Sequence, residues 1–379
     1  MRIAINALSV RSGGGVTLLK NLIRGLLSID QENEYLILIT QGKLGTLGLS
    51  KTCYPNLKTL VCPSRGWVVR SCWEQTVLPS ILRREKVDVL YSPGNQGPVL
   101  LPFPFVVLIQ NVDPLLKREN GSLPSLSMKR AALRIVMRAS VHKARRVIAI
   151  SEFTRRLLAQ EFACNSTKVT VIPHGPPEDA AETPSIDELA RTRKFKIESP
   201  YFLAVSNIRY NKNYENLIYA FHIARSKISS QVKLVIAGDI EQRACFLRLK
   251  HIVQRNGIDS LEHFLGEVDQ GTLRVLYIGS LGLVFPSRLE SFGLPPLEAM
   301  AYGVPVAAAR IDPVVEVCGD AAVYFNPNNP QEIAEAMMRL MKDKSLRKDL
   351  TERGRMRAKL FSWRETARRT LEVLQGAVG

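Results

Sequence analysis

The chain has 379 residues, of which 46% are hydrophobic, so it is long enough for two domains that each bury a core. Lys and Arg outnumber Asp and Glu by 52 to 35, which gives a formal net charge of +17. This excess favours anionic partners, namely nucleic acid, anionic lipid surfaces or phosphorylated small molecules, and argues against cationic ones.

Cysteine usage and hydropathy exclude several further classes of protein. The longest apolar stretch, residues 99–109, contains prolines and is too short to span a bilayer. Met1 and Arg2 lead directly into a strand-like run, which predicts that no secretory leader is present. We therefore expect a cytoplasmic protein, either free or peripheral on the inner face of the cytoplasmic membrane. The cysteines lack the two-residue spacing of zinc or redox sites, which favours reduced thiols: Cys53, Cys62, Cys72, Cys164, Cys245 and Cys318.

In chain order, the first half alternates strand-like runs with helical patterns. The runs are continuously hydrophobic, as in strands that are covered on both faces, and residues 16–29 have the spacing of an amphipathic helix. Such alternation predicts a parallel α/β domain. The predicted strands span residues 2–8, 35–40, 87–92, 105–111, 146–151 and 169–175.

A polar and Pro-rich segment interrupts this alternation. We place a linker at residues 181–200, between a first domain at 1–180 and a second at 201–361. The fold class predicted is α/β, with two Rossmann-like doubly wound domains facing across a cleft and ligands at the carboxyl ends of the strands. We expect the last segment, residues 362–379, to form a helix that packs back on the first domain. The strands predicted for the second domain span residues 201–206, 232–238, 261–268, 281–287, 304–310 and 321–326.

Two segments contain residue types that suit the binding of phosphate. Gly13, Gly14 and Gly15 lie between the first strand and the first helix, where backbone without Cβ atoms can approach an anion. A simple flexible loop is the alternative. Arg209 and Lys212 follow the first strand of the second domain, where two cations could hold a diphosphate, although basic residues are also common in solvated loops.

The third segment is "FPSRLESFGLPPLEAMAYGVPV", residues 285–306. Pro295 and Pro296 suit the first turn of a helix, so the preceding amides are predicted to form an anion site at its mouth. Glu290 and Glu298 stand on either side of that mouth and could accept hydrogen bonds from sugar hydroxyls. Stabilisation of the helix dipole is the alternative for Glu298. The amides concerned belong to Ser291, Phe292, Gly293 and Leu294.

Within this segment, "ESFGLPPLEAMAYGVPV" strongly resembles the Glu-x7-Glu motif of family 4 of the retaining glycosyltransferases, which have the two-domain GT-B fold. The resemblance extends over nearly the whole chain, with "IAISEFTRRLL", "VIPHG", "NIRYNKN", "FLGEV" and "FSWRETARRTLEVL" as weaker matches. It implies that Glu290 contacts the donor sugar and Glu298 the nucleotide ribose. The donor would be a GDP- or UDP-sugar, and no cofactor is implied.

The same resemblance assigns the remaining donor contacts. Arg209 and Lys212 would hold the diphosphate with the help of the amides at residues 291–294. Gly14 and Gly15 would close over the phosphates. Backbone groups from Gly266 to Val268 would line the base pocket.

One segment departs from the family pattern. Many relatives carry a His at the end of the fourth strand of the first domain, whereas this chain reads "LIQNVDP" there. Asn111 or Asp113 would then take the place of the His beside the reacting sugar. His174 is a second candidate, with a structural role near the hinge as its alternative. The same region favours a mannose-like sugar among the family's donors.

Metal and nucleic acid are not expected as partners. The sequence has no Asp-x-Asp pair, and its five histidines form no helical ligand pair. No motif for binding RNA or DNA is present. We therefore expect a metal-independent site in which cations and helix amides neutralise the phosphates.

The basic first half suggests a second kind of contact. Residues 127–147 form a basic amphipathic pattern, and residues 65–75 place Trp67 and Trp73 among arginines. Both patterns suit the headgroups of an anionic membrane surface, and a lipid-linked acceptor would explain them. An ordinary helix with a solvated polar face is the alternative.

The function predicted is retaining transfer of a hexose, mannose-like, from a nucleotide-diphosphate sugar to a growing glycan or lipid-linked acceptor. We expect the first domain to bind the acceptor and the second the donor. No enzyme nucleophile is evident, which favours substitution on one face of the sugar with the diphosphate as proton acceptor. Two alternatives remain: a nucleotide-sugar epimerase on the same frame, and a non-enzymatic protein that binds lipid or nucleic acid.

Overall fold

The computed structural model describes residues 1–9, 14–40, 54–62, 66–100, 103–116, 128–193, 195–197, 200–227, 232–258 and 262–378. Gly13, Arg65 and residue 127, on which parts of the predictions rest, lie outside these ranges. The chain divides into two compact units. The first is Met1–Gly175 with Ser362–Gly379, and the second is Pro176–Phe361.

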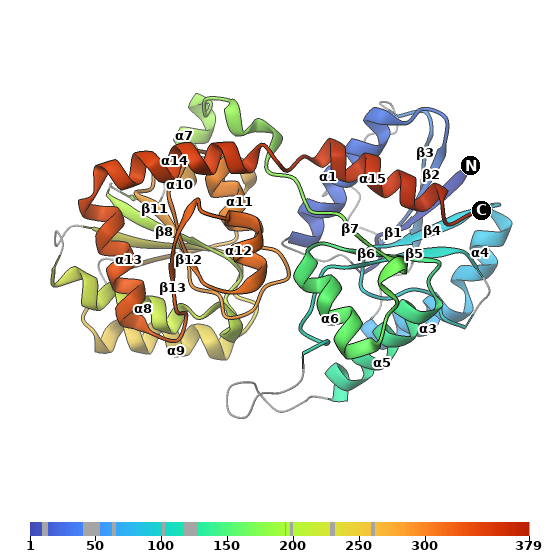
Figure 1. The fold of residues 1–379 in the computed structure, drawn as a ribbon, viewed down its shortest axis with the longest axis horizontal. Coiled ribbons are helices and arrows are strands. Elements are labelled where there is room, and N and C mark those ends of the chain that lie inside the picture. The colour runs from blue at the N-terminus through green and yellow to red at the C-terminus, as the bar shows by residue number, and fades with distance from the viewer. Residues whose placement is uncertain are drawn as a thin grey trace. The chain divides into compact units, whose positions relative to one another are not determined.

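The first unit is built on a parallel sheet of seven strands in the order β3-β2-β1-β4-β5-β6-β7. Helices α1 and α15 lie on one face of this sheet and α5 and α6 on the other (Figure 1). The strands are β1 (Arg2–Asn6), β2 (Glu34–Thr40), β3 (Leu57–Cys62), β4 (Val89–Ser92), β5 (Phe105–Ile109), β6 (Arg146–Ala149) and β7 (Val169–Val171). The helices are α1 (Gly14–Ile29), α3 (Trp67–Thr76), α4 (Leu78–Arg84), α5 (Met128–Lys143), α6 (Glu152–Phe162), the short η2 (Ser166–Lys168) and α15 (Trp363–Gln375).

Strand β3 was not predicted, because it lacks the continuous apolar character of the others. Only its end residues, Leu57 and Cys62, are buried. Among the described residues it lies at the edge of the sheet and pairs with β2 alone. An edge strand needs less burial than a central one, which is why its sequence is weakly hydrophobic.

The C-terminal helix α15 packs in the first unit, against α1. A Cβ atom at Gly25 of α1 would lie 2.8 Å from the Cβ of Ala367, so only glycine permits this helix spacing. Trp363, at the start of α15, is buried and stacks on His174 with ring centroids 5.4 Å apart. This close packing explains why a segment from the end of the chain belongs with its beginning.

The second unit is a parallel sheet of six strands in the order β10-β9-β8-β11-β12-β13. Its strands are β8 (Tyr201–Val205), β9 (Lys233–Ala237), β10 (Glu262–Gly266), β11 (Gly282–Phe285), β12 (Val306–Ala309) and β13 (Ala322–Phe325). Its helices are η3 (Glu178–Ala181), α7 (Ile186–Arg193), η4 (Tyr210–Lys212), α8 (Tyr214–Arg225), α9 (Arg243–Arg255), α10 (Gln270–Ile278), α11 (Leu294–Ala301), α12 (Asp312–Cys318), α13 (Pro330–Lys342) and α14 (Lys344–Ala358).

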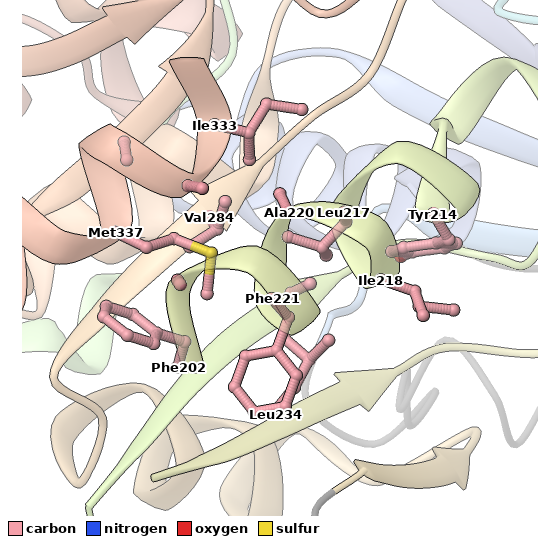
Figure 2. Close-up of a cluster of buried hydrophobic side chains, with 14 of the residues drawn as sticks. Phe202, Tyr214, Leu217, Ile218, Ala220, Phe221, Leu234, Val284, Ile333 and Met337 are labelled. Carbon is pink, nitrogen blue, oxygen red and sulfur yellow. The ribbon is translucent and has the colours of Figure 1, made fainter. Parts of the chain in front are cut away.

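Helices α8 and α13 pack against this second sheet through a hydrophobic core. Figure 2 shows Phe202 and Val284 from the strands, Phe221 from α8 and Met337 from α13 converging on one another. All four are fully buried, and truncating one such aromatic side chain to Ala typically costs about 3–5 kcal/mol. The core holds β8 and β11 rigidly side by side.

The order of the strands determines where a ligand would bind in the second unit. From β8 the chain proceeds to β9 and β10 on one side, whereas β11, β12 and β13 lie on the other. Neighbouring β8 and β11 therefore form the switch point of the sheet, and ligands of open α/β sheets bind beyond the carboxyl ends of such strands. The segments that follow these two strands carry the residues of the candidate site.

The segment predicted as an irregular linker, residues 181–200, contains the helix α7, and the division between the units falls earlier, after Gly175. None of the described residues of α7 is buried, so the helix lacks the apolar face by which a sequence reveals a helix. It is held instead through polar contacts with Arg274 of α10, which is 4% exposed.

Candidate active site

The centre of the candidate site is an ion pair between the two strands of the switch point. Lys212 ends the short helix η4 after β8, and Glu290 lies in the segment between β11 and α11. The Nζ atom of Lys212 donates to Oε1 of Glu290 at 2.6 Å, and the two side chains are only 16% and 14% exposed. The structure thus brings together two residues that the sequence predicted as catalytic and that are 78 positions apart.

Arg209, the other predicted diphosphate ligand, is the residue that precedes η4. Its guanidinium lies 3.6 Å from Oε1 of Glu241, and the other carboxylate oxygen, Oε2, accepts a hydrogen bond from the side-chain amide of Asn207 at 3.3 Å. The Nε atom of Arg209 is buried and has no hydrogen-bond partner in the described part of the chain. The side chain therefore retains donor capacity for an anion, with Glu241 as a competitor for its charge.

We expect the substitution Glu241→Gln to tighten the binding of UDP or GDP, because it removes the carboxylate that competes for Arg209. Both side chains are partly exposed, at 38% and 45%, so the pair is worth roughly 0.2–1 kcal/mol and the gain in affinity is about two- to fivefold. Titration calorimetry at low salt measures it. Asp239→Asn, which removes the same charge from an exposed position of the same loop, is the matched control. Equal tightening in both variants would mean that net charge, rather than the pairing with Arg209, is responsible.

The mouth of α11 forms the second part of the site. The helix begins at Leu294, preceded by Gly293 with φ +118°, a backbone conformation that favours glycine. The two prolines stand in the first turn, where their missing N–H groups leave no intrahelical bond unmade. Phe292 is 5% exposed and packs edge-on against Phe361, so this side chain anchors the segment and could contact a ligand only through its backbone. Ser291, beside it, is half-buried.

Glu298 lies in the interior of the unit, one turn into α11. It is 6% exposed, and its Oε2 atom accepts a hydrogen bond from the hydroxyl of Tyr277 at 2.9 Å. Burial raises the pKa of Glu298 to about 7, although the bond from Tyr277 opposes the rise and the charge of Asp179 adds to it. The carboxyl therefore titrates in the physiological range. Its predicted contact with a ribose remains a prediction.

Tyr277 is a residue that the sequence analysis missed. It lies on α10, is fully buried and stacks on Tyr302 with ring centroids 5.4 Å apart. In the sequence, Tyr277 is indistinguishable from the other apolar residues by which this helix faces the core. The signal that could have revealed it is the choice of Tyr over Phe, because a buried phenol usually has a hydrogen-bond partner.

The predicted base pocket lies at the end of β10. Gly266 has φ +69°, and its carbonyl accepts a hydrogen bond from the amide of Gly238 at the end of the neighbouring β9. The space next to its Cα is open for 4 Å, and Val268 is half-buried. The contact of Gly266 and Val268 with a base remains a prediction.

In the first unit, the structure corrects the expectation for the Gly-rich segment. Gly14 and Gly15 belong to the first turn of α1 rather than to the preceding loop. Glycine costs a helix only about 1 kcal/mol, and at a helix start part of that cost is avoided. Gly14 is exposed with open space around it, so its amide could still face an anion at the helix N-terminus.

Asn111 and Asp113 follow β5, at the carboxyl edge of the first sheet. The side-chain oxygen of Asn111 accepts a hydrogen bond from the amide of Asp113 at 3.0 Å. Arg130 of α5 donates to the carbonyl of Asp113 at 2.7 Å, and its guanidinium lies 3.7 Å from the carboxylate. Asp113 is therefore held in place, and Arg130 supplies its counter-charge. Asn111, in contrast, is exposed.

Two basic residues of α5 have contacts that differ from the expected ones. Arg130 donates to the carbonyl of Leu116 in addition to that of Asp113, and Arg134 donates to Pro114 and to Glu161 at 2.8 Å. These arginines therefore brace the segment after β5 and do not project from the unit. Arg138, on the same helix, is exposed, and Ile135 is 70% exposed.

His174 has the structural environment that was the alternative to a catalytic role. It is 6% exposed and stacks on Trp363, and burial lowers its pKa to about 4. The imidazole is therefore neutral near pH 7 and packs as an aromatic ring.

The described ranges contain neither a cluster of metal ligands nor a helix suited to span a membrane. No group of three or more His, Cys, Asp or Glu side chains there is arranged to hold a metal ion. Of the helices that the structure describes, none combines the length and the apolar character needed to cross a bilayer.

Comparison with known proteins completes the description of the site. The chain is 27% identical over 253 residues to O-antigen chain mannosyltransferase B of Escherichia coli. The match covers 62% of this chain and 61% of that protein, which is less than two thirds of the length of that protein. A glycosyltransferase from Rickettsia africae ESF-5 superposes with a TM-score of 0.76 at 18% identity, over 100% of this chain and 98% of that chain. Anabaena HepE in complex with UDP-glucose superposes with a TM-score of 0.78 at 18% identity, over 99% and 100%. The two structures show a common fold.

Two family models match consecutive parts of the chain. The model described as Glycosyltransferase Family 4 matches residues 12–179, and the model described as Glycosyl transferases group 1 matches residues 185–357. Together they cover most of the chain, including every strand of the two parallel sheets except β1. The chain belongs to family 4 of the glycosyltransferases and has the GT-B fold.

Proposed function

We propose that this glycosyltransferase moves a hexose, mannose-like, from a GDP- or UDP-sugar to a growing glycan or lipid-linked acceptor, with retention of configuration. The observation that carries the proposal is the ion pair of Lys212 and Glu290 at the carboxyl ends of β8 and β11. A cation and a carboxylate in contact, both largely sheltered from solvent, provide one group for the diphosphate and one for sugar hydroxyls.

The geometry suggests a division of labour in the reaction. When the bond to the anomeric carbon breaks, the diphosphate oxygens gain negative charge, and Lys212, Arg209 and the first amides of α11 would stabilise it. Glu290 would orient the sugar through its hydroxyls. The acceptor hydroxyl would attack from the face that the diphosphate leaves, and its proton would pass to the leaving diphosphate. Asn111 and Asp113 would contact the acceptor side.

Three observations support the finer assignments. The similarity to O-antigen chain mannosyltransferase B supports mannose as the sugar, and the likeness to HepE with bound UDP-glucose supports a nucleotide-sugar donor. On the acceptor side, the exposed residues Ile135 and Arg138 of α5 combine an apolar and a basic side chain. That combination suits peripheral contact with an anionic membrane and hence a lipid-linked acceptor.

Incubation with GDP-mannose or UDP-glucose and a panel of lipid-linked and free glycans tests this proposal. The expected products are free nucleoside diphosphate and an α-linked sugar on the acceptor, because the sugars of these donors are themselves α-linked. An isomerised nucleotide sugar formed without acceptor would replace the proposal with epimerase activity. Absence of any turnover, together with binding to vesicles or nucleic acid, would replace it with a binding function.

A further inference from the structure

A chain of buried groups surrounds the carboxyl of Glu298. The hydroxyl of Tyr277 donates to its Oε2 atom at 2.9 Å and lies 3.4 Å from the carbonyl oxygen of Pro295, in the first turn of the same helix. The Tyr277 ring stacks on Tyr302, whose hydroxyl lies 3.4 Å from Asp179. Tyr277 thus fixes both the carboxyl and the start of α11. Of the two carboxylate oxygens of Glu298, its hydroxyl bonds only Oε2 within the described part of the chain, which leaves Oε1 for another partner.

We propose that Tyr277 is a positioning residue for the nucleotide: its hydroxyl holds one oxygen of Glu298, so that the other is presented to the ribose hydroxyls of the donor. The inference rests on the proposed function, because it requires Glu298 to contact the ribose. A ribose diol supplies two hydroxyl donors, and a carboxylate accepts both far better than a carboxylic acid does. The role of Tyr277 is therefore to set the orientation of the carboxyl and to favour its ionised form.

The pKa of Glu298 provides a test of this role, because a Tyr277 side chain that only filled space would not change that pKa. The pKa of Glu298 is raised to about 7 by burial, and the hydrogen bond from Tyr277 lowers it from an even higher value. The facing ionisable groups are Tyr277 on α10, Tyr302 after α11, and Asp179 on η3, which is paired with Arg274.

Two arginines of α14 also lie near α11, but their described contacts are with residues other than Glu298. Arg355 of α14 lies against Gly303, and Arg357 of α14 binds the carbonyls of Val317 and Glu316 on α12. Because a ribose binds best to the ionised carboxyl, donor affinity should fall as the pH drops through about 7. Removal of the Tyr277 hydroxyl should move that fall to higher pH.

The substitution Tyr277→Phe keeps the stacked ring and removes only the hydroxyl. Infrared titration of the ligand-free protein, with the Glu298 band identified by its loss in Glu298→Gln, should give a midpoint near 7 in the native protein and about one unit higher in the variant. The affinity for GDP-mannose or UDP-glucose should fall roughly fivefold at about pH 7 and recover towards about pH 8.5. These probes are esterified at both ends of the diphosphate, so their own charge does not change in this range.

Tyr201→Phe is the matched control. The Tyr201 hydroxyl is buried and donates to the carbonyl of Leu276 at 2.7 Å, so its loss removes a comparable bond to α10 without touching Glu298. This control should leave the midpoint and its pH profile unchanged.

The outcomes separate the inference from the function on which it rests. Equal midpoints, or equal affinities at all pH values, for the native protein and Tyr277→Phe overturn the inference while donor binding stands. Failure of the native protein to bind either nucleotide sugar overturns the proposed donor site, and with it the role of Tyr277 in binding, whatever the infrared midpoints show. Shifted midpoints together with shifted pH profiles in Tyr277→Phe alone support the inference.

Discussion

We expect the substitutions Lys212→Ala and Glu290→Gln each to lower the rate of sugar transfer by about 10²–10³-fold, in an assay of nucleoside diphosphate released in the presence of acceptor. Lys212→Ala removes the cation that, under the proposed function, meets the developing charge on the diphosphate. Glu290→Gln keeps the shape of the side chain but removes the charge that holds Lys212, 2.6 Å away, and that is proposed to orient the sugar. Both losses should appear mainly in kcat, since these contacts strengthen as the bond breaks.

Stability must be separated from catalysis in this experiment, because each single variant leaves a partly buried partner without its counter-charge. The double variant Lys212→Ala/Glu290→Gln has no unpaired charge. It should unfold at nearly the native temperature and still be as slow as either single variant, since the two residues act as a unit. Arg248→Ala, which breaks a more exposed pair with Glu215 on the same unit, is the control and should retain native activity. Near-normal turnover in either site variant would remove the assignment.

The site could be predicted from the sequence to the extent that it follows the ends of the buried strands. The runs that became β8 and β11 are continuously apolar and easy to find, and Lys212 and Glu290 lie just beyond them. Two prolines after a glycine also fixed the start of α11 to within one residue. These signals are local, so a single sequence carries them.

The parts that were missed depend on contacts between distant residues. Glu241 competes for Arg209 because the loops after β8 and β9 lie side by side, and nothing near Glu241 in the sequence indicates that. Tyr277 of α10 donates a hydrogen bond to Glu298 of α11, and the two residues are 21 positions apart. Arg130 and Arg134 looked like a membrane-facing stripe, yet both bind carbonyls of the segment after β5. The spacing of residues along a sequence shows which side chains share a face of a helix, but it does not show what that face contacts.

Helix α7 shows the same limit and leads to a prediction about stability. Arg274 of α10 is 4% exposed and binds Asp179 at 3.1 Å, Glu188 at 2.9 Å and the carbonyl of Thr183 at 3.0 Å. Two of these partners, Thr183 and Glu188, come from residues 181–200, the stretch that the sequence suggested to be a polar linker, and Asp179 lies just before it. A single buried guanidinium thus orders a segment that has no apolar anchor of its own among its described residues.

We therefore expect Arg274→Ala to destabilise the second unit by roughly 2 kcal/mol and to release residues 178–193 first, because the loss removes charged hydrogen bonds at a buried position. Hydrogen exchange of α7 and urea unfolding of the full chain measure the two effects. Arg191→Ala is the matched control: it removes another arginine between the same two elements, paired with Asp269 at 3.3 Å, but both side chains are about half exposed, so the change should stay within about 0.5 kcal/mol. If α7 keeps its protection in Arg274→Ala, or loses it equally in Arg191→Ala, the buried guanidinium does not hold this segment. Release of α7 with an intact sheet would instead show that a polar sequence can be folded by one buried charge from a neighbouring helix.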